Sequence, residues 1–150
     1  MNHESNTSRS GSVDNEDFLR LLVRAQIHLW DVADNALRAG HGLPLAHYLP
    51  MRVIAGTPDC RVQDIADGLA ITSGGASQAV DRIEKAGHVQ RRPHPANRRS
   101  SIVELTTQGR TLLDAAATTL DQEVERHLTS LSPTARTQVA DGLAAMLPQR

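Results

Sequence analysis

Apolar residues recur at helical spacing along most of this chain and predict six helices. The first covers about residues 14–40, and a shorter one covers about 44–54. Pro50 lies inside the shorter helix and should kink or split it, because proline removes one backbone hydrogen bond. Two long helices close the chain, and we expect Thr106 to cap the first of them and Ser132 the second.

The middle of the chain carries two short helices and then a β-hairpin. The first short helix has one apolar stripe, formed by Val62, Ile65, Ala66 and Leu69. Thr72 or Ser73 caps the second, which buries Ala76, Val80 and Ile83 and stops at Gly87. Helices joined by about three residues are typical of a helix-turn-helix. Runs with β-branched residues at 88–92 and 101–105 flank a loop of turn formers and arginines, which predicts the hairpin.

This order of elements predicts a mainly α fold: four helices, a β-hairpin and two further helices. A helix-turn-helix followed by a basic hairpin is a winged helix, expected at about 56–106 within a single domain at 14–147. The flanking helices, at about 14–40 and 106–147, carry apolar stripes wider than the middle of the chain can cover, which favours a homodimer. Residues 1–13 are polar and without periodicity, so we expect a disordered arm there.

Composition narrows the classes of protein to consider. The chain has 150 residues, of which 39% are hydrophobic and 22% charged, and it holds no apolar run near the ~20 residues that a membrane helix needs. It also opens without a secretory signal, so we expect a cytoplasmic protein with no membrane partner. The single cysteine, Cys60, excludes a disulfide framework and a cysteine-based zinc site.

Charge is uneven although the net charge is only −1. Residues 86–103 hold four arginines and no acid. Arg98 and Arg99 lie beside Asn97 at the expected hairpin tip, where they would contact phosphates or enter the minor groove of DNA; the alternative is a solvated loop. Only one of Arg91 and Arg92 can face DNA, because adjacent strand residues point to opposite faces.

The second short helix presents a small, polar face opposite its buried stripe. Ser77 and Gln78 can hydrogen-bond base edges or phosphates, with Arg82 at the edge of this face. Gly74 and Gly75 would let the helix N-terminus approach a phosphate, unless they form only a loose helix start. The expected DNA-binding residues are therefore Thr72, Ser73, Gly74, Gly75, Ser77, Gln78, Arg82, Arg91, Asn97, Arg98 and Arg99.

One stretch of the chain resembles the winged-helix core of the MarR family of bacterial transcription regulators. It reads VQDIADGLAITSGGASQAVDRIEKAGHVQRRPHPANRRSSIVELTTQGRTLL. The matching pieces are Asp64-Ile65-Ala66 with Leu69, Ser77, Asp81-Arg82-Ile83-Glu84, Gly87, Arg91, Asn97-Arg98-Arg99, and Leu105-Thr106 with Gly109. The resemblance implies a homodimeric repressor or activator on a pseudo-palindromic, double-stranded operator. The chain departs from the family at Asn97, where an acid usually holds the wing arginine, and at Pro50.

Regulators of this family often bind small phenolic or lipophilic ligands. His28, Trp30, His47 and Tyr48 would lie near the implied cleft and are candidate lining residues, although Trp30 and Tyr48 also suit the core or a dimer interface. Cys60 does not match the first-helix cysteine of the peroxide-sensing branch, which favours a packing or surface thiol. No cofactor is expected.

Two other classes of function fit the sequence less well than DNA binding. An enzyme would need a nucleophile with its base, a metal triad or a phosphate loop, and the sequence offers none of these patterns. Histidine spacing does not argue for metal either: His127 follows Glu123 by four residues, which favours an ion pair. A winged helix that binds protein instead of DNA is the alternative, but it would favour an apolar helix face and an uncharged wing.

Overall fold

The computed structural model describes residues 13–148, and in these residues the chain folds into six helices and one antiparallel hairpin. The elements are α1 (Asn15–His41), α2 (Leu45–Gly56), α3 (Val62–Leu69), α4 (Ser73–Lys85), β1 (Val89–His94), β2 (Asn97–Leu105), α5 (Thr107–Leu128) and α6 (Pro133–Met146). The predicted fold class and order of elements are confirmed. Of the arm expected at 1–13, all but Val13 lies outside the described residues.

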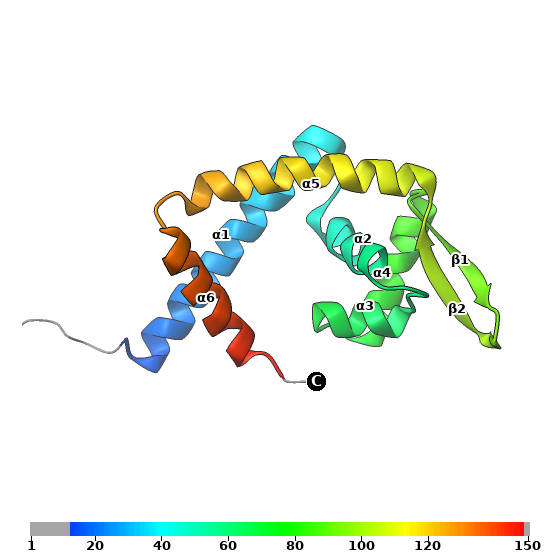
Figure 1. Ribbon diagram of the computed structural model, residues 1–150, viewed down its shortest axis with the longest axis horizontal. Coiled ribbons are helices and arrows are strands. Elements are labelled where there is room, and N and C mark those ends of the chain that lie inside the picture. Colours follow the sequence, from blue (N-terminus) through cyan, green and yellow to red (C-terminus); the bar gives the residue numbers. More distant parts are fainter. Residues whose placement is uncertain (1–12, 149–150) are drawn as a thin grey trace, which may run out of the picture.

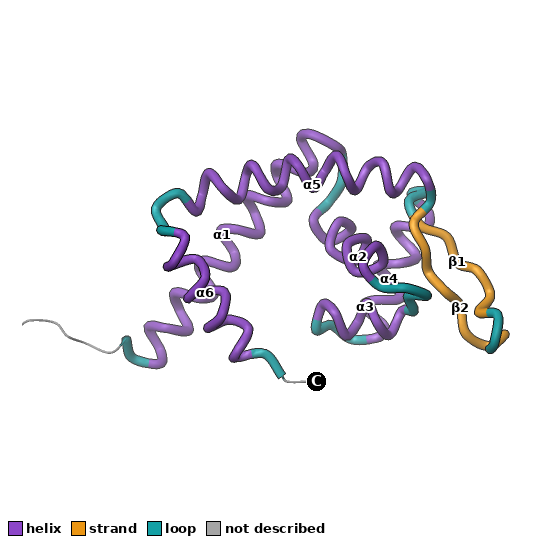
Figure 2. The backbone as a smooth tube through the Cα atoms, in the orientation of Figure 1, coloured by secondary structure: helices purple, strands orange, loops and turns teal. Residues whose placement is uncertain are grey.

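The two long helices cross, and the other elements lie to either side of this crossing. Figure 1 shows α5 passing over α1, with α2, α3, α4 and the hairpin gathered beneath one end of α5 and α6 turning back at the other. The tube in Figure 2 shows that the hairpin extends beyond the helices at the edge of the molecule. None of the helices in residues 13–148 is long and apolar enough to span a bilayer.

Helix α1 begins and ends where its sequence predicts. The Asp14 carboxylate accepts a 2.8 Å hydrogen bond from the Asp17 backbone N–H, which caps the free donors of the first turn. At the other end Gly42 adopts φ +63°, a left-handed conformation that glycine adopts without a Cβ penalty, and its N–H donates to the Arg38 carbonyl.

Helix α2 runs unbroken from Leu45 to Gly56, so the expectation that Pro50 would split it is wrong. Proline removes only one backbone donor from the helix. The Pro50 ring is fully buried beside Met51, so it contributes to the hydrophobic core while the rest of the helical ladder stays formed.

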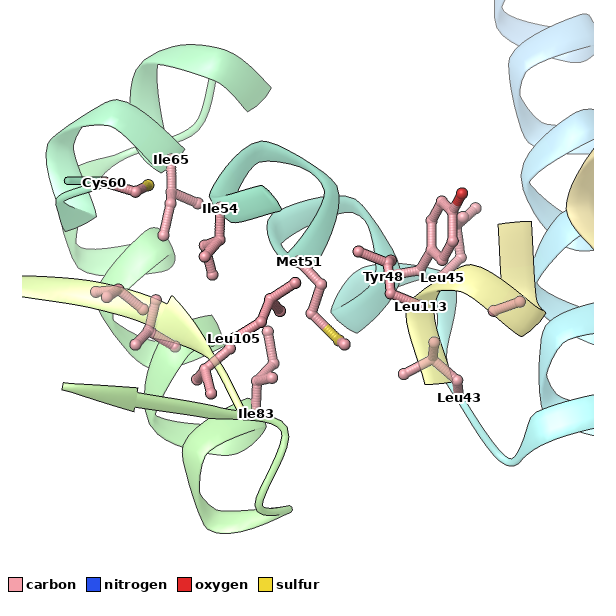
Figure 3. Packing of buried hydrophobic residues seen from close by; sticks show 14 of the residues in the cluster. Leu43, Leu45, Tyr48, Met51, Ile54, Cys60, Ile65, Ile83, Leu105 and Leu113 are labelled. Atoms are coloured by element: carbon pink, nitrogen blue, oxygen red, sulfur yellow. The ribbon is translucent and has the colours of Figure 1, made fainter. Parts of the chain in front are cut away.

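The hydrophobic core lies among α2, α3, α4, the hairpin and the first half of α5, and Ala33 and Leu37 of α1 join it (Figure 3). The stripe predicted on the second short helix, Ala76, Val80 and Ile83, is fully buried. Ile65 of α3 and Leu113 of α5 are buried in the same cluster. Burial of these stripes fixes which face of α4 points outward.

The junction between the hairpin and α5 is tightly bonded. The Thr106 hydroxyl donates to the Gly87 carbonyl at 2.7 Å and accepts from the Gly109 N–H at 3.0 Å. A Cβ at Gly109 would lie 1.9 Å from the His88 carbonyl oxygen, so only glycine lets the backbones approach this closely. The hairpin therefore leaves the body of the fold from a fixed base.

Helices α1 and α6 leave many large apolar side chains exposed. These include Phe18, Leu21, Ile27, Val139, Leu143 and Met146, each at least 41% exposed, and α6 has no buried residue. A groove of about 400 Å³ runs between the two helices, with Phe18 on one side and Leu143 on the other. An apolar surface of this kind is typical of a protein interface.

Candidate nucleic-acid interface

The N-terminus of α4 is held by side chains of its own turn and of α3. The Thr72 hydroxyl accepts a 3.0 Å hydrogen bond from the Gly75 N–H, and the Ser73 hydroxyl donates to the Gln63 side chain at 2.7 Å. Thr72 is therefore the N-cap, one of the two residues predicted. A Cβ at Gly75 would lie 3.2 Å from the Thr72 hydroxyl, whereas a Cβ at Gly74 would meet open space.

The outward face of α4 is polar. Three exposed residues follow this face at intervals of four: Gly74, Gln78 and Arg82. Ser77 is half-buried. No hydrogen bond or ion pair engages the Gln78 or Arg82 side chain within residues 13–148. These side chains are thus available to an external partner.

The hairpin tip is a tight turn at Pro95 and Ala96, between His94 and Asn97. The Asn97 side-chain oxygen accepts a 3.1 Å hydrogen bond from the Arg99 N–H. Asn97 therefore uses its side chain to fold the backbone of the tip. Arg99 is exposed, and the side chain of Arg98 lies outside the described part of the structure.

The two arginines at the base of the hairpin point to opposite faces, as strand alternation predicts. Arg91 forms ion pairs with Asp81 at 2.6 Å and with Glu84, both on α4. Arg92 pairs with Glu104 of the neighbouring strand at 2.8 Å and with Asp59 at 3.2 Å. These carboxylates neutralise both guanidinium groups.

Sequence reasoning missed these partners because it counted acids only along the chain around the arginines. Asp81 and Glu84 lie one helical turn apart on α4, shortly before the strand that carries Arg91. The position of these two acids shortly before Arg91 was the signal in the sequence that could have predicted the ion pairs. Arg91 as a direct DNA contact stays a prediction, and its side chain is only 26% exposed.

The sequence pattern of the MarR family matches residues 41–100, from the end of α1 into β2. The HTH-type transcriptional regulator TtmR of Methylorubrum extorquens is 33% identical over 109 residues, which are 72% of this chain and 55% of that protein. The middle of the chain therefore matches the MarR family. The chain spans about half the length of the first curated relatives that it matches.

Solved structures of MarR regulators share this fold. Sco3205 of Streptomyces coelicolor, a MarR family regulator solved in complex with DNA, is 25% identical with a TM-score of 0.80, over 92% of this chain and 96% of that one. CouR of Rhodococcus jostii RHA1, solved with p-coumaroyl-CoA, is 22% identical with a TM-score of 0.82, over 93% and 99% of the two chains.

The four residues predicted to line a ligand cleft lie on α1 and α2, and their role in ligand binding stays a prediction. Tyr48 is buried in the core, as its alternative interpretation stated, and burial raises the pKa of its hydroxyl. Trp30 is 39% exposed on α1. His28 is exposed on the same helix, where its ring contacts that of His127. His28 and Trp30 thus lie on α1, whereas Tyr48 lies on α2.

His47, the fourth residue, is half-buried on α2. Burial lowers the pKa of its imidazole, and the positive charges of Arg82, His88 and Arg38 lower it further. A cavity of about 710 Å³ opens elsewhere, between His41 at the end of α1, His88, and Gln108 and Thr111 of α5. Sequence reasoning missed this cavity because its lining residues are far apart along the chain.

Cys60 is a packing residue. Its side chain is buried, and burial together with the nearby Asp64 carboxylate raises the thiol pKa to about 11. Because the reactive species is the thiolate, this thiol is unreactive near neutral pH. The Cys60 carbonyl also accepts a 2.7 Å hydrogen bond from the Val103 N–H, which ties the segment before α3 to the hairpin.

Proposed function

We propose that this protein is a sequence-specific, double-stranded DNA-binding transcription regulator of the MarR family, and that it acts as a homodimeric, ligand-responsive repressor. The observation that carries the proposal is the polar outward face of α4, where Gln78 and Arg82 have no partner among residues 13–148, next to a hairpin whose tip exposes Arg99. An α-helix fits the major groove, and arginines neutralise phosphates or enter the minor groove. Such a role belongs in the cytoplasm and requires no catalysis.

The interface of the proposal comprises the residues predicted from the sequence on α4 and at the hairpin tip. Gln78 and Ser77 would read bases, and the Gly74 turn would approach a phosphate. Arg82, Arg99 and Arg98 would neutralise the backbone. The division into a winged helix at about 56–106 and dimerisation helices at about 14–40 and 106–147 belongs to the same proposal.

Homodimerisation accounts for the exposed apolar side chains of α1 and α6. A second copy of the chain would cover the groove between Phe18 and Leu143 and remove these side chains from water. Two symmetric winged helices would then meet successive major grooves about 34 Å apart, which implies a pseudo-palindromic operator.

The effector in this proposal is a small lipophilic or phenolic compound. The support is that CouR, which shares the fold, was solved with p-coumaroyl-CoA. Within the described residues, the cavity beside His41 and His88 is lined by polar Gln108 and Thr111 together with apolar Leu112 and Ala115, a suitable lining for an aromatic ring with polar substituents.

Selection of bound duplexes from a random pool at two salt concentrations tests the proposal. We expect enrichment of one inverted repeat and weaker binding at higher salt. A Gln78→Ala variant should enrich a different sequence while keeping most of its affinity. Failure to enrich any duplex at low ionic strength would contradict DNA binding and favour the alternative, a winged helix that binds protein.

A further inference from the structure

The base of the hairpin is fastened to the body of the protein on both faces. On one face, Arg91 bridges Asp81 and Glu84 of α4, and its own backbone N–H donates to the second Glu84 oxygen at 3.0 Å. On the other face, Arg92 bridges Glu104 and Asp59, and Asp59 lies in the loop between α2 and α3. We call Arg91, Arg92 and these four acids the wing clamp.

Attraction to DNA does not explain the acidic residues of the wing clamp. Asp81 lies beside Arg82 on α4 and is 62% exposed, so its carboxylate would repel a nearby phosphate backbone. The clamp also engages both arginines of β1, which leaves phosphate contact to the tip. The arrangement is therefore costly for attraction to DNA but well suited to holding the hairpin in place.

A two-stranded hairpin is marginally stable alone, and its orientation depends on what its base contacts. Each bridging arginine in the wing clamp links two acidic partners, which fixes the direction of the strands more firmly than a single pair would. Arg91 sets the hairpin against α4, and Arg92 sets it against the loop that precedes α3.

We propose that Arg91 and Arg92 are positioning residues, which hold the hairpin at a fixed angle to α4 so that its tip reaches the minor groove when α4 occupies the major groove. This inference rests on the proposed DNA-binding function. It assigns Arg91 an internal role in place of the direct DNA contact that its sequence position suggested.

Neutralising the acids on α4 distinguishes a direct DNA contact of Arg91 from a positioning role, because the two roles predict opposite changes in DNA affinity. If Arg91 contacted phosphate directly, the Asp81→Asn, Glu84→Gln double variant would free its charge and bind DNA more tightly. If the wing clamp positions the hairpin, the same variant binds about three- to tenfold more weakly although two negative charges have been removed. The Asp114→Asn, Asp121→Asn variant of α5 removes the same charge away from the hairpin and should bind like the unmodified protein.

Footprinting shows whether the weaker binding comes from the hairpin. In the Asp81→Asn, Glu84→Gln variant, hydroxyl-radical protection of the flanking minor groove should fade while protection of guanine N7 in the major groove remains. Arg91→Lys should show the same fading, since lysine keeps the charge but lacks the planar fork whose two nitrogens reach Glu84 and Asp81 separately. Tighter or unchanged binding with intact flanking protection would overturn the proposal.

A measurement without DNA keeps the inference separate from the proposed function. Amide hydrogen exchange in the free double variant should accelerate across Val89–His94 and Asn97–Leu105 and stay unchanged in α5. If the unmodified protein ignored DNA, the proposed function would fail while this comparison would still test the clamp. Unchanged exchange in the hairpin would overturn the clamp even if the protein binds DNA.

Discussion

At the residue scale, two glycines with different surroundings give opposite predictions for the same substitution. Gly109→Ala would place a methyl group 1.9 Å from the His88 carbonyl oxygen, and this backbone atom cannot rotate away. We expect a decrease of about 2–4 kcal/mol in the free energy of unfolding, measured by chemical denaturation.

Gly74→Ala is the matched control, because a Cβ there meets open space. Alanine should stabilise α4 by up to ~1 kcal/mol through its helix propensity. It should nevertheless weaken binding of the selected duplex, because the new methyl group would stand between the helix N-terminus and a phosphate. Unchanged DNA affinity would show that this turn does not approach the backbone.

His47 links the stability of the fold to pH. Burial and the charges of Arg82, His88 and Arg38 lower the pKa of its imidazole below the usual 6.5, so the folded state favours the neutral ring. Its contribution to stability is therefore present above about pH 6.5 and is lost as the pH falls through the lowered pKa. His47→Gln should reduce the loss of stability between pH 7.5 and pH 5, measured by urea unfolding. Equal losses in both proteins would contradict this explanation.

At the scale of elements, the hairpin tip should carry the electrostatic part of DNA binding. Replacing Arg98 and Arg99 with alanine should weaken binding about equally for all sequences. It should also reduce the slope of log K against log salt by about 0.9 for each phosphate that the arginines no longer neutralise. Arg126→Ala at the far end of α5 is the control and should leave the slope unchanged. A double variant with the original slope would exclude the tip from phosphate binding.

The individual helices were predictable because their apolar spacing survives in the fold. Ala76, Val80 and Ile83 are buried as their periodicity required, and the outward face of α4 follows from that burial. The contact of Arg92 with Asp59 in the wing clamp was not predictable, since it spans 33 positions and depends on how the hairpin docks. The continuity of α2 at Pro50 also depends on packing in the core, and this packing cannot be predicted from the helix propensity of single residues.

At the scale of the whole molecule, the exposed apolar surface of α1 and α6 should be the dimer interface. Leu143→Asp would place a charge in the groove opposite Phe18, where burial by a second copy would strip it of water. We expect a monomer by sedimentation and DNA affinity reduced by at least about tenfold, since one half-site alone would be bound. Asp141→Asn on the same helix should remain dimeric. A Leu143→Asp protein that stays dimeric would place the interface elsewhere.

The central claim is that two symmetric copies of this chain read double-stranded DNA with α4 and the hairpin tip. The most direct measurement is a footprint of the purified protein on its selected duplex, combined with the mass of the complex in solution. We predict two protomers per duplex and two protected major-groove segments about ten base pairs apart, each flanked by a protected minor groove. A stable monomer that leaves duplex DNA unprotected at low salt would contradict the account.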